Sequence, residues 1–81
     1  MTKHNKNLIE ALKKAFTDDD IISDGATDWD LFNLIENIEA NDAEWEEVNG
    51  DDEAEFYAER GRVYEVDAAG YIASVAIYTL A

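Results

Sequence analysis

The 81-residue sequence contains no cysteine, no proline and a single histidine. Without cysteine the chain can form no disulfide framework, no Cys-type zinc or iron–sulfur site and no thiol nucleophile. The one histidine, His4, lies close to the N-terminus, which disfavours a His-based catalytic triad and a multi-histidine metal site. We therefore expect no catalytic residues, no metal site and no cofactor.

Long hydrophobic runs are also absent. No segment approaches the roughly 20 apolar residues that span a bilayer, and no signal-peptide pattern opens the chain. We therefore expect a cytoplasmic protein. Apolar residues nonetheless make up 47% of the sequence, which is enough to form a packed core. The length predicts one domain covering residues 1–81.

Positive charge is scarce: 6 Lys and Arg stand against 20 Asp and Glu, for a net charge of −14. From Asp18 to Glu59 the chain carries 17 carboxylates and no basic residue. Arg60 and Arg62 follow directly, and we expect them to neutralise nearby Glu59 and Glu65. An acidic surface of this kind repels nucleic acid and anionic membranes. The favoured partner is therefore a basic protein, with neither nucleic acid nor membrane as a direct partner.

The first segment has the pattern of an amphipathic helix. Leu8, Leu12 and Phe16 are spaced four residues apart, which places them on one helical face. Asparagine is a favoured N-cap residue, so either Asn5 or Asn7 is expected to cap this helix.

A second helix is predicted from Thr27, which is expected to act as its N-cap. Its apolar stripe includes Leu34 and Ile38, and its opposite face is polar. We expect the helix to end near Ala40 or Asn41.

The next segment, residues 42–47, is ambiguous. It could form a short third helix, with Asn41 as its cap and Glu44 completing a capping box. It could also form a strand with Trp45 as its inward residue, and we favour the strand. The dipeptide Asn49-Gly50 predicts a turn in either case.

After Gly50 the residues become β-branched and aromatic in short runs, which is typical of strands. We expect strands near 54–59, 62–67 and 71–79, joined by tight links. The predicted fold class is therefore α+β: two N-terminal helices followed by a small antiparallel β-sheet of three or four strands.

The number of carboxylates invites a comparison with DNA. A compact domain of this length is about 30 Å long, and duplex DNA carries about 18 phosphate charges over that distance. The 17 carboxylates between Asp18 and Glu59 fall in the same range. Residues three or four apart on a helix are separated by about 5 to 6 Å, comparable to phosphates along a strand. A cationic groove that binds DNA could therefore accept such a row of side chains.

In size, acidity and mixed α/β character, the whole chain resembles the small acidic DNA-mimic inhibitors of bacteriophages and mobile elements. These include antirestriction proteins, uracil-DNA glycosylase inhibitors and anti-CRISPR proteins. The resemblance implies noncatalytic, stoichiometric inhibition of a nuclease, CRISPR effector, or DNA repair or restriction enzyme in the host cell cytoplasm. The residues expected to bind the partner are the acids of the second helix and the segments around it: Asp28, Asp30, Glu36, Glu39, Asp42, Glu44, Glu46, Glu47, Asp51, Asp52 and Glu53.

Two other interpretations of the acidic surface remain open. The chain could be an adaptor or regulatory module that binds a basic protein surface unrelated to nucleic acid. The acids could also form a merely solvated surface of the halophile type. Against the halophile reading, four of the six basic residues are lysines clustered at the N-terminal end.

Overall fold

The computed structural model describes all 81 residues and shows an α+β fold with three helices and one five-stranded sheet. The predicted α+β class is confirmed, but the predicted sheet of three or four strands has too few strands, and two strands precede the second helix. The elements are α1 (Lys3–Ala15), β1 (Ile21–Ser23), β2 (Asp28–Asp30), α2 (Leu31–Ala40), α3 (Asp42–Asn49), β3 (Glu55–Glu59), β4 (Arg62–Val66) and β5 (Tyr78–Leu80).

The C-terminal strand completes the sheet. Its strand order is β2-β1-β5-β4-β3, and every pairing is antiparallel. The last strand, β5, lies at the centre, with Leu80 opposite Ile22 of β1 and Tyr78 opposite Val63 of β4. It therefore joins two hairpins, β1–β2 and β3–β4, that are separated in the sequence by α2 and α3.

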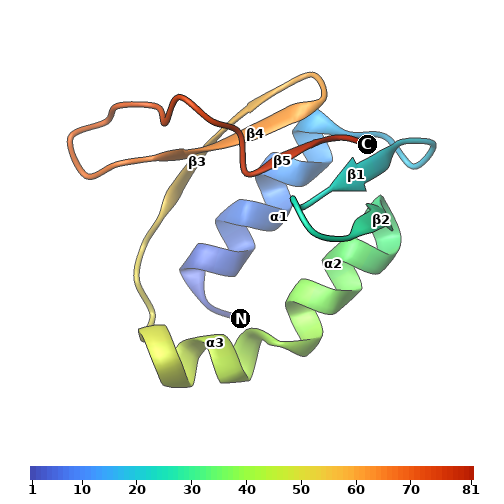
Figure 1. Cartoon of the computed structure of the whole chain (residues 1–81). Coiled ribbons are helices and arrows are strands. Elements are labelled where there is room, and N and C mark those ends of the chain that lie inside the picture. The colour runs from blue at the N-terminus through green and yellow to red at the C-terminus, as the bar shows by residue number, and fades with distance from the viewer.

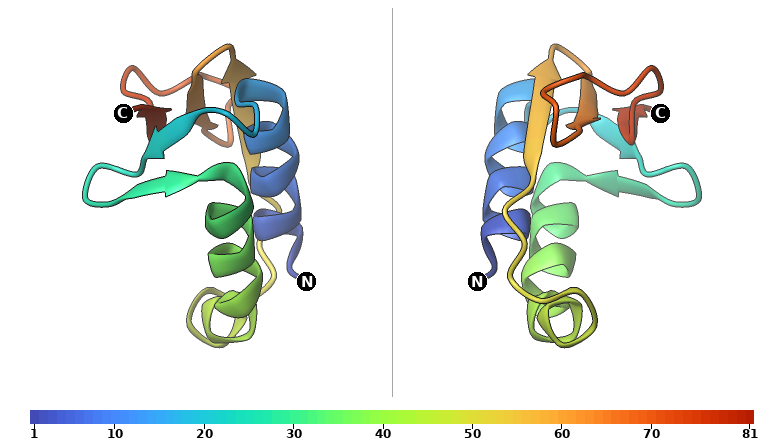
Figure 2. Two further views of the ribbon diagram at one scale, coloured as in Figure 1. Left: turned by 90° about the vertical axis from the view of Figure 1, so that its right-hand side faces the viewer. Right: turned by 90° about the vertical axis from the view of Figure 1, so that its left-hand side faces the viewer.

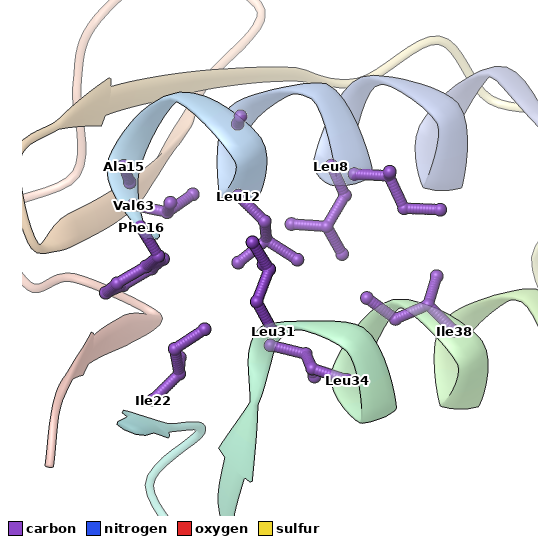
Figure 3. Packing of buried hydrophobic residues seen from close by; sticks show 11 residues of the cluster. Leu8, Leu12, Ala15, Phe16, Ile22, Leu31, Leu34, Ile38 and Val63 are labelled. Carbon is purple, nitrogen blue, oxygen red and sulfur yellow. The ribbon is translucent and has the colours of Figure 1, made fainter. Parts of the chain in front are cut away.

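The core lies between α1, α2 and the sheet. Figure 3 shows Leu8 and Leu12 of α1 pointing toward Leu31 and Leu34 of α2. The apolar spacing of each helix predicted which of its faces is buried, and α1 also packs along β3 and β4. The buried cluster contains 11 apolar residues: Leu8, Ile9, Ala11, Leu12, Ala15, Phe16, Ile22, Leu31, Leu34, Ile38 and Val63.

The sheet and α3 lie at opposite ends of the molecule. In Figures 1 and 2, α1 and α2 run side by side, the sheet crosses one end of this pair, and α3 covers the other. The N-terminus lies at the α3 end and the C-terminus lies in the sheet. The molecule measures 32 × 29 × 20 Å.

The first helix begins earlier than predicted. Thr2 is its N-cap, with extended backbone, and its Oγ1 accepts a hydrogen bond from the Asn5 N–H at 3.2 Å. The prediction of Asn5 or Asn7 as the cap was wrong because both lie inside the helix. The Asn5 side chain is buried and donates instead to Asp42 Oδ1 at 2.9 Å.

The second helix begins later than predicted. Thr27 is not its cap, because residues 28–30 form β2, in which Trp29 lies opposite Ile22 of β1. Asp30 caps α2, and its carboxylate accepts the Asn33 N–H at 2.7 Å. The helix ends at Ala40, within the predicted range.

The preference for a strand over residues 42–47 was wrong, because Asp42–Asn49 forms α3. Trp45 faces inward, but from a helix: its ring stacks on the His4 ring with centroids 4.1 Å apart. Asn41 precedes the helix as expected, yet its side chain donates to Asn37 O and makes no capping bond. Gly50 ends α3 with a φ of 73°, a conformation that favours glycine.

The predicted strands 54–59 and 62–67 correspond to β3 and β4, but the predicted strand 71–79 is mostly absent. Only Tyr78–Leu80 forms β5, and Ile72 makes one isolated bridge to Val66. Between them the Ala73 and Ile77 N–H groups donate to carbonyls of β4, while residues 73–75 lie exposed. The short β4 and the small side chains at 73, 74 and 76 give this segment little apolar surface to bury.

Candidate functional site

Helix α3 follows α2 directly, and the two helices form a corner at the end of the molecule remote from the sheet (Figure 1). This corner and the turn after it carry seven exposed carboxylates that take part in no hydrogen bond or ion pair. We call this set the acidic corner: Glu36, Glu39, Glu44, Glu46, Glu47, Asp52 and Glu53.

The carboxylates of α2 border two hollows. Glu36 and Glu39 lie beside Asp18 and Lys13 at a hollow between α1 and α2. On the other flank of the helix, Glu36 lies with Asp28 and Asp30. The structure therefore brings the predicted acids of β2 and α2 together, with one lysine beside them.

The carboxylates of α3 point in different directions. Glu44 borders a groove on the inner side of the helix. Glu46 and Glu47 are both exposed and do not border that groove. The acidic corner therefore wraps around α3 and does not form a single flat row.

Three of the predicted partner-binding residues make intramolecular contacts. Asp30 caps α2, and Asp51 Oδ1 accepts the Lys3 N–H at 2.8 Å. Asp42 accepts hydrogen bonds from the Thr2 N–H, the Thr2 hydroxyl and the Asn5 amide. These carboxylates hold helix termini and the N-terminal segment in place, which sequence reasoning had not distinguished from surface charge.

Few of the acids are neutralised by basic side chains. The structure contains two ion pairs, Arg60–Asp20 at 2.9 Å and Arg62–Glu59 at 3.7 Å. The expected pairing of Arg62 with Glu59 is confirmed, whereas Arg60 pairs with Asp20. None of the four lysines forms an ion pair, and all are exposed on α1. Most of the negative charge therefore faces solvent without a counter-charge.

Local hydrogen bonds further favour the charged form of three carboxylates. A side-chain hydrogen bond from Arg60 lowers the pKa of Asp20, and a backbone hydrogen bond from Thr27 lowers the pKa of Asp24. Partial burial raises the pKa of Asp42, but hydrogen bonds from Asn5 and Thr2 outweigh it and leave the pKa below its ordinary value. These groups therefore remain anionic at neutral pH.

The structure also contains a groove that sequence reasoning missed. It has a volume of about 570 Å³ and lies between α1, α2, α3 and the strands. We call it the aromatic groove and define it by six of its lining residues: His4, Leu8, Ile38, Trp45, Phe56 and Tyr78. Burial, and to a lesser extent the charge of Asp24, raises the pKa of Tyr78, so its hydroxyl stays protonated.

Neither surface offers an evident nucleophile and base. The His4 Nδ1 lies 2.9 Å from Asn5 Oδ1, and the His4 ring is enclosed by Trp45 and Phe56. No group of three or more His, Cys, Asp or Glu residues has the geometry to hold a metal ion. What the arrangement can supply is negative charge on the acidic corner and apolar surface in the groove.

Comparisons with protein-family models, with curated proteins and with solved structures found no match to this chain. The three helices are too short and too polar to cross a membrane. Any functional proposal must therefore rest on the charge and shape of the two surfaces.

Proposed function

We propose that this protein is a noncatalytic, stoichiometric inhibitor of a nucleic-acid-binding protein, acting as a DNA mimic through its acidic surface. The target would be a nuclease, a CRISPR effector, or a DNA repair or restriction enzyme. The observation that carries this proposal is the acidic corner, whose seven exposed carboxylates make no hydrogen bond or ion pair within the chain. Free carboxylates of this kind can accept hydrogen bonds from the Lys and Arg residues of a DNA-binding cleft.

The dimensions of the chain support the same proposal. Its long axes of 32 and 29 Å correspond to slightly less than one helical turn of duplex DNA, which is about 34 Å long. The carboxylates that cap helices or anchor the N-terminal segment are excluded from the proposed interface, which removes Asp30, Asp42 and Asp51 from the predicted set. Asp28 remains in it, because it is exposed beside Glu36.

The test begins with capture of the target. The immobilised protein is incubated with a bacterial lysate, washed, and eluted with a duplex DNA of about 30 base pairs. We expect the duplex to displace a nucleic-acid-binding protein, identified by mass spectrometry, and this protein's DNA binding should be inhibited by the purified chain. Inhibition should weaken steeply with salt, because both ligands release counterions.

Two charge-reversal variants then locate the interface. The first replaces Glu36, Glu39 and Glu47 with Lys. The matched control replaces Glu10, Asp19 and Glu55 with Lys and changes the net charge by the same amount. Because exposed ion pairs contribute about 0.2 to 1 kcal/mol each, we expect the first variant to bind the target about 100-fold more weakly and the control to lose much less.

Equal loss of inhibition in the two variants would leave only a general charge effect and would contradict the proposed interface. A captured protein that duplex DNA does not displace would instead identify the chain as an acidic adaptor for a basic protein surface.

A further inference from the structure

The aromatic groove is apolar at its base and open above. Leu8 and Ile38 come from the buried cluster, and Trp45 contributes its ring from α3. At the rim, Val48 also lines the groove and is 78% exposed. An exposed valine above an apolar hollow is a surface that a partner side chain can cover.

The rim of the groove carries charge of one sign. Asp24, Glu44 and Glu65 line it from three different parts of the chain, and no Lys or Arg lines it. A positive side chain at the rim would therefore be attracted from several directions. Charge complementarity selects an occupant that combines an apolar group with flanking cations.

A third observation concerns the wall of the groove. The Trp45 Nε1–H is buried and has no hydrogen-bond partner. An unpaired buried donor is unfavourable, and such groups are rare in folded proteins. The other tryptophan, Trp29, donates its indole N–H to Asp24 Oδ2 at 3.0 Å. Because this N–H is covered, an occupant of the groove would contact the Trp45 ring, and the indole N–H can report that contact.

We propose that the aromatic groove receives an apolar side chain that lies between basic residues of the partner protein. This proposal rests on the proposed function, because it takes the partner to be a basic protein. The acidic corner attracts the partner over long distances, and the groove fixes the register through one buried anchor. The inhibitor can thereby distinguish its target from other DNA-binding proteins, which carry similar positive charge but lack an anchor at the required position.

The test uses two synthetic peptides that differ at one position. One is acetyl-Lys-Arg-Leu-Arg-Lys-amide, and the other has Ser in place of Leu. Binding to the full-length protein is followed by NMR, with the Trp45 indole N–H and the Val48 methyl groups as reporters. Because a buried leucine contributes far more than a buried serine, we expect the Leu peptide to bind about fivefold to tenfold more tightly and to shift both reporters.

Two valine variants make the test specific. Val48 lines the groove and Val75 does not, yet they are 78% and 75% exposed. Neither substitution should disturb folding. We expect Val48→Asn to bring the affinity for the Leu peptide close to that for the Ser peptide. Val75→Asn should retain the full difference between the two peptides.

Each outcome bears on the proposal. Equal affinity for the two peptides, or an undiminished preference in Val48→Asn, would overturn the groove as an anchor site. The preference for the Leu peptide does not depend on what the partner does, so it would survive if duplex DNA failed to displace the captured target. Conversely, loss of the preference with DNA competition intact would overturn the anchor and leave DNA mimicry standing.

Discussion

The molecule contains a packed region and an exposed region that are built in different ways. In the packed region, α1 alone contributes six buried residues, and Ile22 and Val63 of the sheet are fully buried. In the exposed region, made of α3 and residues 67–77, no residue is buried. The packed region is stabilised by apolar side chains that recur on one face of α1 and of α2. Helix α3 is instead held in place by a few contacts to the N-terminal segment.

The largest expected difference between the two regions is in the cost of removing an apolar side chain. Leu12 is fully buried, and Val48 is 78% exposed. We expect Leu12→Ala to lower the free energy of unfolding by about 2 to 5 kcal/mol and Val48→Ala by no more than about 0.5 kcal/mol. Urea denaturation followed by circular dichroism measures both changes. A cost above about 1 kcal/mol for Val48→Ala would mean that α3 belongs to the packed region.

A smaller and local effect is expected at the contact that ties the two regions together. Asp42, at the start of α3, accepts hydrogen bonds from Thr2 and Asn5 of the α1 end. We expect Asp42→Asn to accelerate amide hydrogen exchange in α3 several-fold while leaving exchange in the middle of α1 unchanged. Equal acceleration in both helices would show that they open as one unit.

The same contact predicts a pH dependence. Hydrogen bonds from Asn5 and Thr2 hold the pKa of Asp42 below its ordinary value, despite the opposing effect of partial burial. The ionised carboxylate therefore stabilises the native contact at neutral pH, and this stabilisation is lost as the pH falls below about 3.9 toward the native pKa. We expect wild-type α3 to lose exchange protection in that range, and the Asp42→Asn variant to show a weaker dependence on pH. An identical acid profile in the two proteins would contradict this assignment.

Sequence reasoning succeeded in the packed region for a physical reason. The spacing of Leu8, Leu12 and Phe16 determines which face of α1 is buried, and no distant residue is needed to infer it. The β3–β4 hairpin was also predictable from its runs of β-branched and aromatic residues. Its turn uses Gly61 at a φ of 84°, where a Cβ would lie 2.9 Å from the Leu80 side chain.

In the exposed region the decisive partners are distant in the sequence. Residues 42–49 have no apolar stripe, so their sequence alone does not decide between a helix and a strand. The contact that orients Trp45 is its stacking on His4, which lies far away in the sequence. The C-terminal strand is fixed by the pairing of Leu80 with Ile22, which lie far apart in the sequence. Composition alone could not show that α2 begins at Leu31, with Asp30 as its N-cap.

The candidate site was predictable only as a set of charges. The acidic stretch identified the exposed carboxylates of α2 and α3, but it did not separate them from Asp42, which binds the N-terminal segment. The aromatic groove could not be inferred, because its lining comes from all three helices and from β3, β4 and β5, which lie far apart in the sequence. The one available signal was an isolated tryptophan, Trp45, among acidic residues.

The smallest expected effect is the difference between substitutions at the two tryptophans. Trp29 lies in β2, against the packed region, and Trp45 lies in α3, in the exposed region. Trp29→Phe removes a hydrogen bond to Asp24, so we expect it to lower the free energy of unfolding by about 1 kcal/mol. Trp45→Phe removes a buried donor without a partner while keeping an aromatic ring on His4. Removing the unpaired N–H is favourable and offsets the packing lost with the smaller ring. We therefore expect the free energy of unfolding to change by no more than about 0.5 kcal/mol. Urea unfolding followed by the fluorescence of the remaining tryptophan measures both, and a larger cost for Trp45→Phe would mean that packing on His4 outweighs the unpaired donor.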